Sequence, residues 1–108
     1  MKPVEFLGDA LQSLKAFPVS VQKATGVELH KIQLGLEPSD WKPMPSIGAG
    51  VRELRIRDRS GAYRVVYVAQ VRDAIVVLHA FQKKTQRATK RDIEIAAMRF
   101  GQIDWGRK

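Results

Sequence analysis

The segment from residue 51 to residue 84 constrains the fold more than any other part of the chain. Three apolar or alternating runs follow one another here with short turns between them: VRELRIRD, AYRVVYVAQ and DAIVVLHAFQ. Successive side chains of a strand point to opposite faces, so this pattern predicts three consecutive strands that pair antiparallel. The middle run is apolar on both faces apart from one arginine, which is typical of a central strand.

Arginines occupy several positions inside these predicted strands. Arg55 and Arg57 share one face of the first strand, because they lie two residues apart. A two-residue turn at Ser60-Gly61 would place Arg57 opposite Arg64. The same register pairs Arg55 with Val66. Like charges that face each other across a sheet repel, so a sequence that keeps them predicts an anionic partner.

The first forty residues predict a short strand and two helices. Residues 4–6 form the opening strand, and Asp9 is expected to cap a brief helix. A longer helix begins at Pro18, which suits a first turn, and ends at Gly35. Its buried face is formed by residues three or four positions apart: Val21, Thr25, Leu29, Ile32 and Leu36.

The other segments predict a loop and a last helix. Residues 37–50 contain three prolines and two glycines, which indicates an irregular surface loop. Thr89, followed by Asp92, resembles a capping box and opens a final helix. The element order is therefore β-α-α-β-β-β-α. We expect one α+β domain over residues 1–108, with helices packed on a small, mostly antiparallel sheet.

The charge of the chain narrows the classes of partner. Nineteen Lys and Arg against eleven Asp and Glu give a net charge of +8, which favours nucleic acid or an acidic protein that masks the charge. A generally basic surface kept for solubility explains the charge equally well. The chain has no cysteine and only two separated histidines, so we expect no disulfide and no metal site. No apolar run is long enough for a signal peptide or a membrane span, which predicts a cytoplasmic protein.

Four cations form the candidate chemical site: Arg55, Arg57, Arg64 and Lys84. Arginine offers a planar fork of donors to phosphate, and cations fixed on rigid strands could stabilise the added negative charge of a phosphodiester transition state. The alternative is structural. The arginines of the first strand could protect a sheet edge from aggregation, or Arg55 could pair with Glu53. That alternative explains Arg64, on the central strand, less well.

The turn between the second and third strands decides which lysine joins the arginines. A two-residue loop at 71–72 places Lys83 on their face, whereas a three-residue loop at 71–73 places Lys84 there. His79, on the third strand, could serve as an acid or base. Its apolar surroundings in the sequence fit a structural histidine better.

The chain also resembles a known group of proteins. The run LRIRDRSGAYRVVYVA, followed by VVLHAFQKKTQ, resembles the RelE/HigB superfamily of bacterial type II toxins. Together with WKPMPSIGAGVRELR, it makes the whole chain similar to the phage-derived HigB-like branch. The resemblance implies a RelE-like fold and a ribosome-dependent endoribonuclease that cuts messenger RNA without metal or cofactor. It also implies three partners: messenger RNA, the ribosome and a cognate antitoxin, expected to be a HigA-like helix-turn-helix protein.

The resemblance further implies roles for individual residues. The family's basic residues on the first hairpin strand fall on Arg55 and Arg57, and its central-strand arginine falls on Arg64. Its basic residue after the last strand falls on Lys84, which favours the three-residue turn. Lys90 stands where RelE has a catalytic tyrosine, and we expect it to bind RNA.

One departure from the family concerns the proton carrier. Where the family has lysine on the first hairpin strand this chain has arginine, and a guanidinium hardly deprotonates. Lys84, Lys83 or His79 is therefore the better candidate to move a proton.

Two hypotheses from different classes follow. In the first, the protein is an RNA-cleaving toxin in which Arg64 and Lys84 hold the scissile phosphate. That centre fails if Arg64 is buried in a carboxylate pair or if Lys84 lies far from it. In the second, the protein is a ParE-like module that poisons gyrase by contact, or a phage-derived scaffold without activity, since one fold serves several functions.

Overall fold

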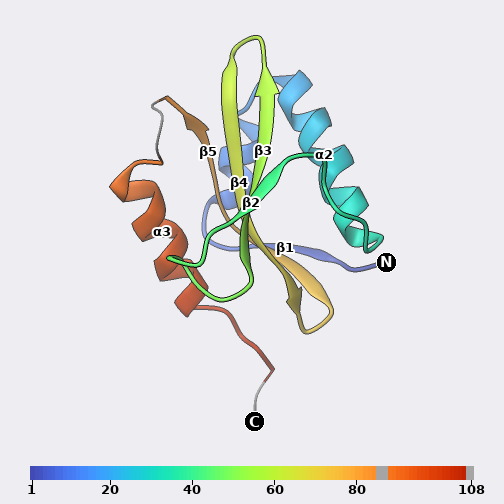
Figure 1. The fold of residues 1–108 in the computed structure, drawn as a ribbon, viewed down its shortest axis with the longest axis vertical. Coiled ribbons are helices and arrows are strands. Elements are labelled where there is room, and N and C mark those ends of the chain that lie inside the picture. The colour runs from blue at the N-terminus through green and yellow to red at the C-terminus, as the bar shows by residue number, and fades with distance from the viewer. Residues whose placement is uncertain (85–87, 107–108) are drawn as a thin grey trace.

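The computed structural model describes residues 1–84 and 88–106. The elements follow in the order β1 (Val4–Phe6), α1 (Ala10–Lys15), α2 (Val19–Gln33), β2 (Trp41–Pro43), β3 (Val51–Asp58), β4 (Gly61–Val71), β5 (Ala74–Lys83) and α3 (Lys90–Gly101). Figure 1 shows the strands between two layers, with α2 on one side and α3 on the other. The predicted α+β class is confirmed.

The five strands form one sheet in the order β1-β5-β4-β3-β2. Every neighbouring pair is antiparallel except β1 with β5, which is parallel. β4 is thus the central strand, and all its residues from 63 to 68 are buried. A strand covered on both faces needs apolar residues at successive positions, and this one has them.

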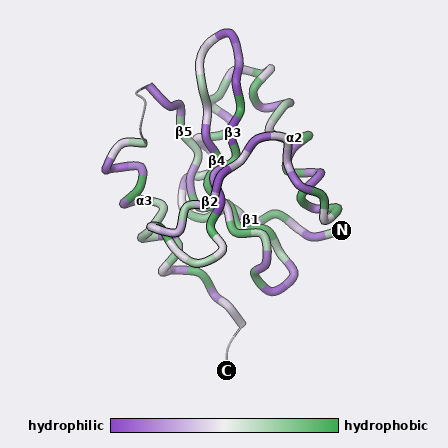
Figure 2. Tube along the Cα trace, in the orientation of Figure 1, coloured by the Kyte–Doolittle hydropathy of each residue, from purple (hydrophilic) through white to green (hydrophobic). Residues whose placement is uncertain are grey.

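The sheet has an apolar core on each face. The face under α1 and α2 is built by alternate strand residues such as Val65 and Tyr67, which pack against Val21, Leu29 and other helix residues. Each fully buried side chain of this size contributes about 1.5–3 kcal/mol. Leu36 was predicted to belong to this face, but α2 ends at Gln33 and Leu36 is 57% exposed. Figure 2 shows the hydrophobic stretches inside the strands and a hydrophilic tip at the β3–β4 turn.

The opposite face is covered by α3 and by the loop that precedes β3. Val66 and Leu78 meet Ala96 of α3 in this second core. The predicted cap is confirmed, since the hydroxyl of Thr89 accepts a hydrogen bond from the backbone N–H of Asp92 at 3.1 Å. On this face, the core covers the end of the sheet that lies near the β4–β5 turn. The end near the β3–β4 turn carries charged residues instead.

Two expectations about the first half of the chain are wrong in detail. The loop predicted for residues 37–50 contains the edge strand β2, which pairs with β3. Asp9 precedes α1 but makes no side-chain cap. Its carboxylate instead accepts a hydrogen bond from Arg99 of α3 at 2.6 Å, and this contact lowers the pKa of Asp9. Arg99 also donates to the carbonyl of Leu78, so one buried arginine joins α3, β5 and the first turn.

The β3–β4 turn lies one residue earlier than expected. Asp58 pairs with Gly61, so Arg59 and Ser60 form the loop, and Arg55 rather than Arg57 lies opposite Arg64. The carboxylate of Asp58 explains the position of the turn, since it accepts hydrogen bonds from the N–H and the hydroxyl of Ser60 at 3.1 and 2.7 Å.

The β4–β5 turn also differs from both predicted forms. Val71 pairs with Ala74, and the loop residues Arg72 and Asp73 have φ angles of 48° and 63°. Positive φ at both central residues is the geometry that matches the twist of a hairpin. Two register shifts, one between Val68 and Val71 and one between Val66 and Tyr67, offset each other, so the upper part of β5 keeps the register that the turn sets.

Candidate functional site

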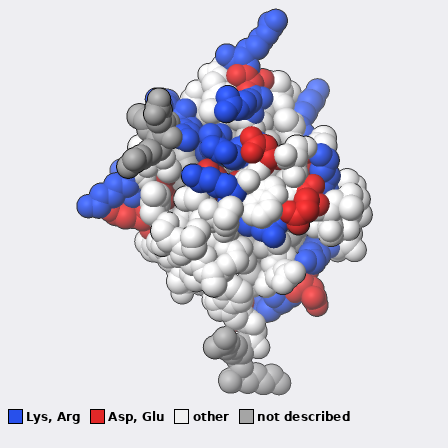
Figure 3. All heavy atoms as spheres, in the orientation of Figure 1, with Lys and Arg blue, Asp and Glu red and all other residues white. Residues whose placement is uncertain are grey.

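The register places the charged residues of the sheet in rows on the α3 side. Three rows cross β5, β4 and β3 in that order: Lys83–Ala62–Arg57, Phe81–Arg64–Arg55 and His79–Val66–Glu53, the last continued on β2 by Lys42. Directly opposed residues share a face, so all these side chains emerge on one side of the sheet. We call Lys42, Arg55, Arg57 and Lys83 the basic surface. Figure 3 shows Lys and Arg atoms gathered over this upper part of the molecule.

Arg64 lies beneath the basic surface and is 3% exposed. Its Nε lies 3.4 Å from a carboxylate oxygen of Glu53, which is also 3% exposed, and its Nη1 donates to the carbonyl of Tyr63 at 3.1 Å. Burial lowers the pKa of Arg64, and the positive charges of Arg55 and Arg57 act in the same direction, whereas Glu53 opposes them. Glu53 therefore pairs with Arg64. It does not form the ion pair with Arg55 that would have given Arg55 a purely structural role.

The structure does not bring Arg64 and Lys84 together on the sheet in the way that the sequence analysis expected. Arg64 is held in a buried pair with the Glu53 carboxylate, and almost none of its side chain reaches the surface. Lys84 lies just beyond the end of β5 and has no partner in the sheet, whereas Lys83, the last residue of β5, pairs with Ala62. The turn favoured by the family resemblance is not the one formed, and Lys83 occupies the arginine face in place of Lys84.

Lys83 lies among other cations, which affect its protonation. Burial lowers its pKa, and the positive charges of Arg64, Arg55 and Lys42 lower it further, whereas Glu53 opposes them. A lysine with a lowered pKa holds a larger share of free amine near neutral pH, which is the form that accepts a proton. Two strand spacings separate Lys83 from Arg57, about 10 Å between their backbones, so both long side chains can reach one phosphate between them.

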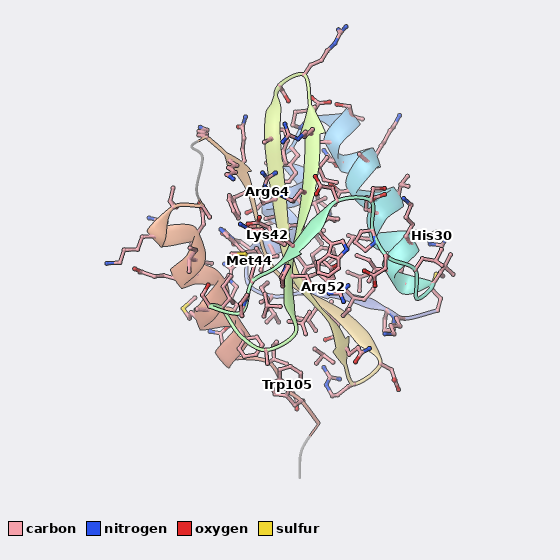
Figure 4. The ribbon with its side chains drawn as sticks, in the orientation of Figure 1. His30, Lys42, Met44, Arg52, Arg64 and Trp105 are labelled. Carbon is pink, nitrogen blue, oxygen red and sulfur yellow. The ribbon has the colours of Figure 1, made fainter. Side chains whose placement is uncertain are left out.

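The other cations of the basic surface are accessible. Arg57 and Lys42 are exposed, and the side chain of Arg55 is 30% exposed with its Nη1 4.0 Å from Asp40. Within residues 1–84 and 88–106, no carboxylate lies within 4.0 Å of Lys42, Arg57 or Lys83. Figure 4 shows Lys42 and Arg64 in the same region of the sheet. Lys42 was missed by the sequence analysis, because it belongs to the short strand β2 inside a proline-rich segment.

His79 borders the basic surface but is nearly enclosed. It is 6% exposed, and its Nε2 lies 2.9 Å from Asp92 Oδ1. The ring stacks on Phe81 with centroids 5.2 Å apart. This environment agrees with the structural role that its apolar strand indicated, and His79 fastens β5 to the first turn of α3.

Lys90 lies in the first turn of α3 with its side chain 91% exposed, 3.8 Å from Glu94. Its role in RNA binding stays a prediction. No group of three potential metal ligands occurs among the residues that the structure describes. In the same part of the chain, no helix has the length and apolar character that crossing a membrane requires.

Comparisons with known proteins agree with this fold. The family model described as "Phage derived protein Gp49-like (DUF891)" matches residues 12–101. A crystal structure of the isolated RelE toxin of E. coli superposes with a TM-score of 0.56, covering 80% of this chain and 89% of that one at 20% identity. No curated protein matches the sequence. The predicted family and fold are thus confirmed, and the chain belongs to the phage-derived Gp49-like family with the fold of RelE.

Proposed function

We propose that this protein is the toxin of a type II toxin–antitoxin pair and cuts messenger RNA in the decoding site of the ribosome, without a metal. The fold shared with the RelE toxin supports the toxin class. The proposal that it cleaves RNA is supported by one observation. The four cations of the basic surface lie on one face of the sheet, and one of them, Lys83, has a lowered pKa. An antitoxin of acidic character would complement this face and silence the toxin.

The proposed centre differs from the one that the sequence suggested. The free amine of Lys83 takes the proton of a ribose 2′-hydroxyl, and the 2′-oxygen attacks the adjacent phosphorus. The bond from phosphorus to the 5′-oxygen breaks, which leaves a 2′,3′-cyclic phosphate, and the departing 5′-oxygen takes a proton from water to become a 5′-hydroxyl. Arg57 and Arg55 hold the phosphate oxygens as their charge increases. Arg64, which is buried beneath these residues, compensates the negative charge of Glu53, and its positive charge lowers the pKa of Lys83.

The test measures cleavage of a defined message on programmed ribosomes by mapping new RNA ends. Lys83→Ala is expected to lower the rate by about 10²–10⁴-fold, the usual contribution of a general base. Lys23→Ala, which removes an exposed lysine from α2 on the far side of the sheet, is the matched control and should cleave normally. Full activity of a folded Lys83→Ala protein would contradict the proposed centre.

The pH dependence separates a base from a simple cation. Below the lowered pKa of Lys83 the ammonium cannot accept a proton, so the rate should rise with pH through that pKa and then level off. Lys83→Arg keeps the charge but not the base. Its residual rate should lack the rising limb, and an unchanged profile would show that another group carries the proton.

One observation favours the gyrase-directed or inactive alternative, namely the burial of Arg64 in its pair with Glu53. A module that acts by protein contact does not need an accessible central arginine. If the alternative holds, expression should produce DNA breaks or no effect, with no new ends in translated messages.

A further inference from the structure

Phe81 is an aromatic side chain set among the cations. It is half-buried, lies opposite Arg64 in the middle row, and stacks on His79 with an angle of 22° between the rings. Its inner edge packs against the second core. A partly accessible ring next to several cations is the combination that binds single-stranded nucleic acid, because every base has a face that can stack.

The position of Phe81 on β5 sets its neighbours along the strand. His79, Phe81 and Lys83 succeed one another on the same face of β5, so Phe81 stands between the His79 ring, which stacks on one of its sides, and Lys83. In the Lys83 row the central residue is Ala62, which is partly buried. A methyl group is the smallest side chain in this row, so between Lys83 and Arg57 little side-chain volume stands over β4.

The ring is also held in place before any ligand arrives. His79 is fixed by Asp92, and Asp92 is fixed in turn by the hydroxyl of Thr89, which donates to its Oδ2 at 2.7 Å. A preorganised platform loses little conformational freedom when it binds a ligand. His79 of β5, together with Asp92 and Thr89 at the start of α3, therefore holds the Phe81 ring on the side that His79 covers.

We propose that Phe81 is a stacking platform for one nucleobase of the RNA substrate, seated over Ala62 with its phosphate between Lys83 and Arg57. This inference rests on the proposed function, because it needs single-stranded RNA at the basic surface. Stacking tolerates any base, so the site sets the position of the strand at the cleavage centre rather than the identity of the base.

The test uses ribosomes programmed with a message whose vacant decoding-site codon carries 2-aminopurine and 2′-O-methyl groups, which prevent cleavage. Stacking on Phe81 should quench the 2-aminopurine fluorescence when toxin is added. Phe81→Leu keeps an apolar side chain in the core but removes the platform, so quenching should require about 5–150-fold more protein. Phe81→Trp should quench as well as the native toxin, and Ala62→Val should quench less because it fills the seat.

Trp105→Leu is the matched control, since it removes an exposed ring at the other end of the molecule (Figure 4). Equal quenching by native toxin and a folded Phe81→Leu variant would overturn the platform. So would native toxin that cleaves the unmodified message without changing the fluorescence, and in that case the proposed function would stand. Absence of both cleavage and quenching would overturn the proposed function, and the platform with it.

Discussion

The pair between Arg64 and Glu53 is the residue-scale feature that most changes the interpretation of the site. A central-strand arginine within a basic motif predicts a phosphate ligand, yet the neighbouring strand supplies a carboxylate on the same face. Both groups are buried, so each compensates the desolvation of the other. An activity lost on mutation of Arg64 would therefore not identify a catalytic residue.

We expect Arg64→Ala to lower the free energy of unfolding by about 3–5 kcal/mol, because it leaves the Glu53 carboxylate buried without a partner. The double variant Glu53→Leu/Arg64→Met removes both charges and should lose clearly less. Urea unfolding of the two variants measures the difference. A single variant as stable as the native protein would mean that Glu53 reaches water when Arg64 is removed.

At the scale of elements, the contact between the loop before β3 and α3 leaves no space for an added atom. A Cβ at position 48 would lie 2.5 Å from the Phe100 ring, so Gly48→Ala should push α3 from its place and cost about 1–3 kcal/mol. Gly26→Ala is the matched control, since nothing lies within 4 Å of its Cβ and it stands inside α2. It should stabilise the protein by about 0.5–1 kcal/mol.

Thermal unfolding of the two alanine variants should therefore shift the midpoint in opposite directions. Similar midpoints would show that the loop yields to the new methyl group and that α3 keeps its place. The comparison isolates packing, because both substitutions reduce the freedom of the unfolded chain equally.

The faces of the strands could be predicted from the sequence, but their pairing could not. Alternation placed Arg55, Arg57 and Arg64 on one face, and this is confirmed because the actual register differs by two residues, which preserves the face. The pairing itself depends on the Asp58 side chain and on positive φ at Arg72 and Asp73. Positive φ is unusual for residues other than glycine, so the β4–β5 loop was misplaced, and with it the lysine that joins the site.

At the scale of the whole molecule, the chain carries a net charge of +8, and four of its nineteen Lys and Arg residues lie together on the basic surface. The Glu53 carboxylate pairs with Arg64, and the Asp40 carboxylate lies 4.0 Å from Arg55, too far for a strong ion pair. The basic surface therefore keeps most of its charge for a partner. A local excess of this kind attracts a polyanion from solution and makes the affinity depend on salt.

Four cations that each neutralise one phosphate of a single strand should give a slope of about −3 in a plot of log affinity against log salt. Lys42→Ala should reduce this slope by about 0.7, because one contact is lost, whereas Lys23→Ala on α2 should leave it nearly unchanged. Fluorescence anisotropy of an uncleavable RNA between about 50 and 200 mM salt measures both. Equal slopes for the two variants would mean that RNA responds to the net charge of the chain, and that the basic surface is not where it binds.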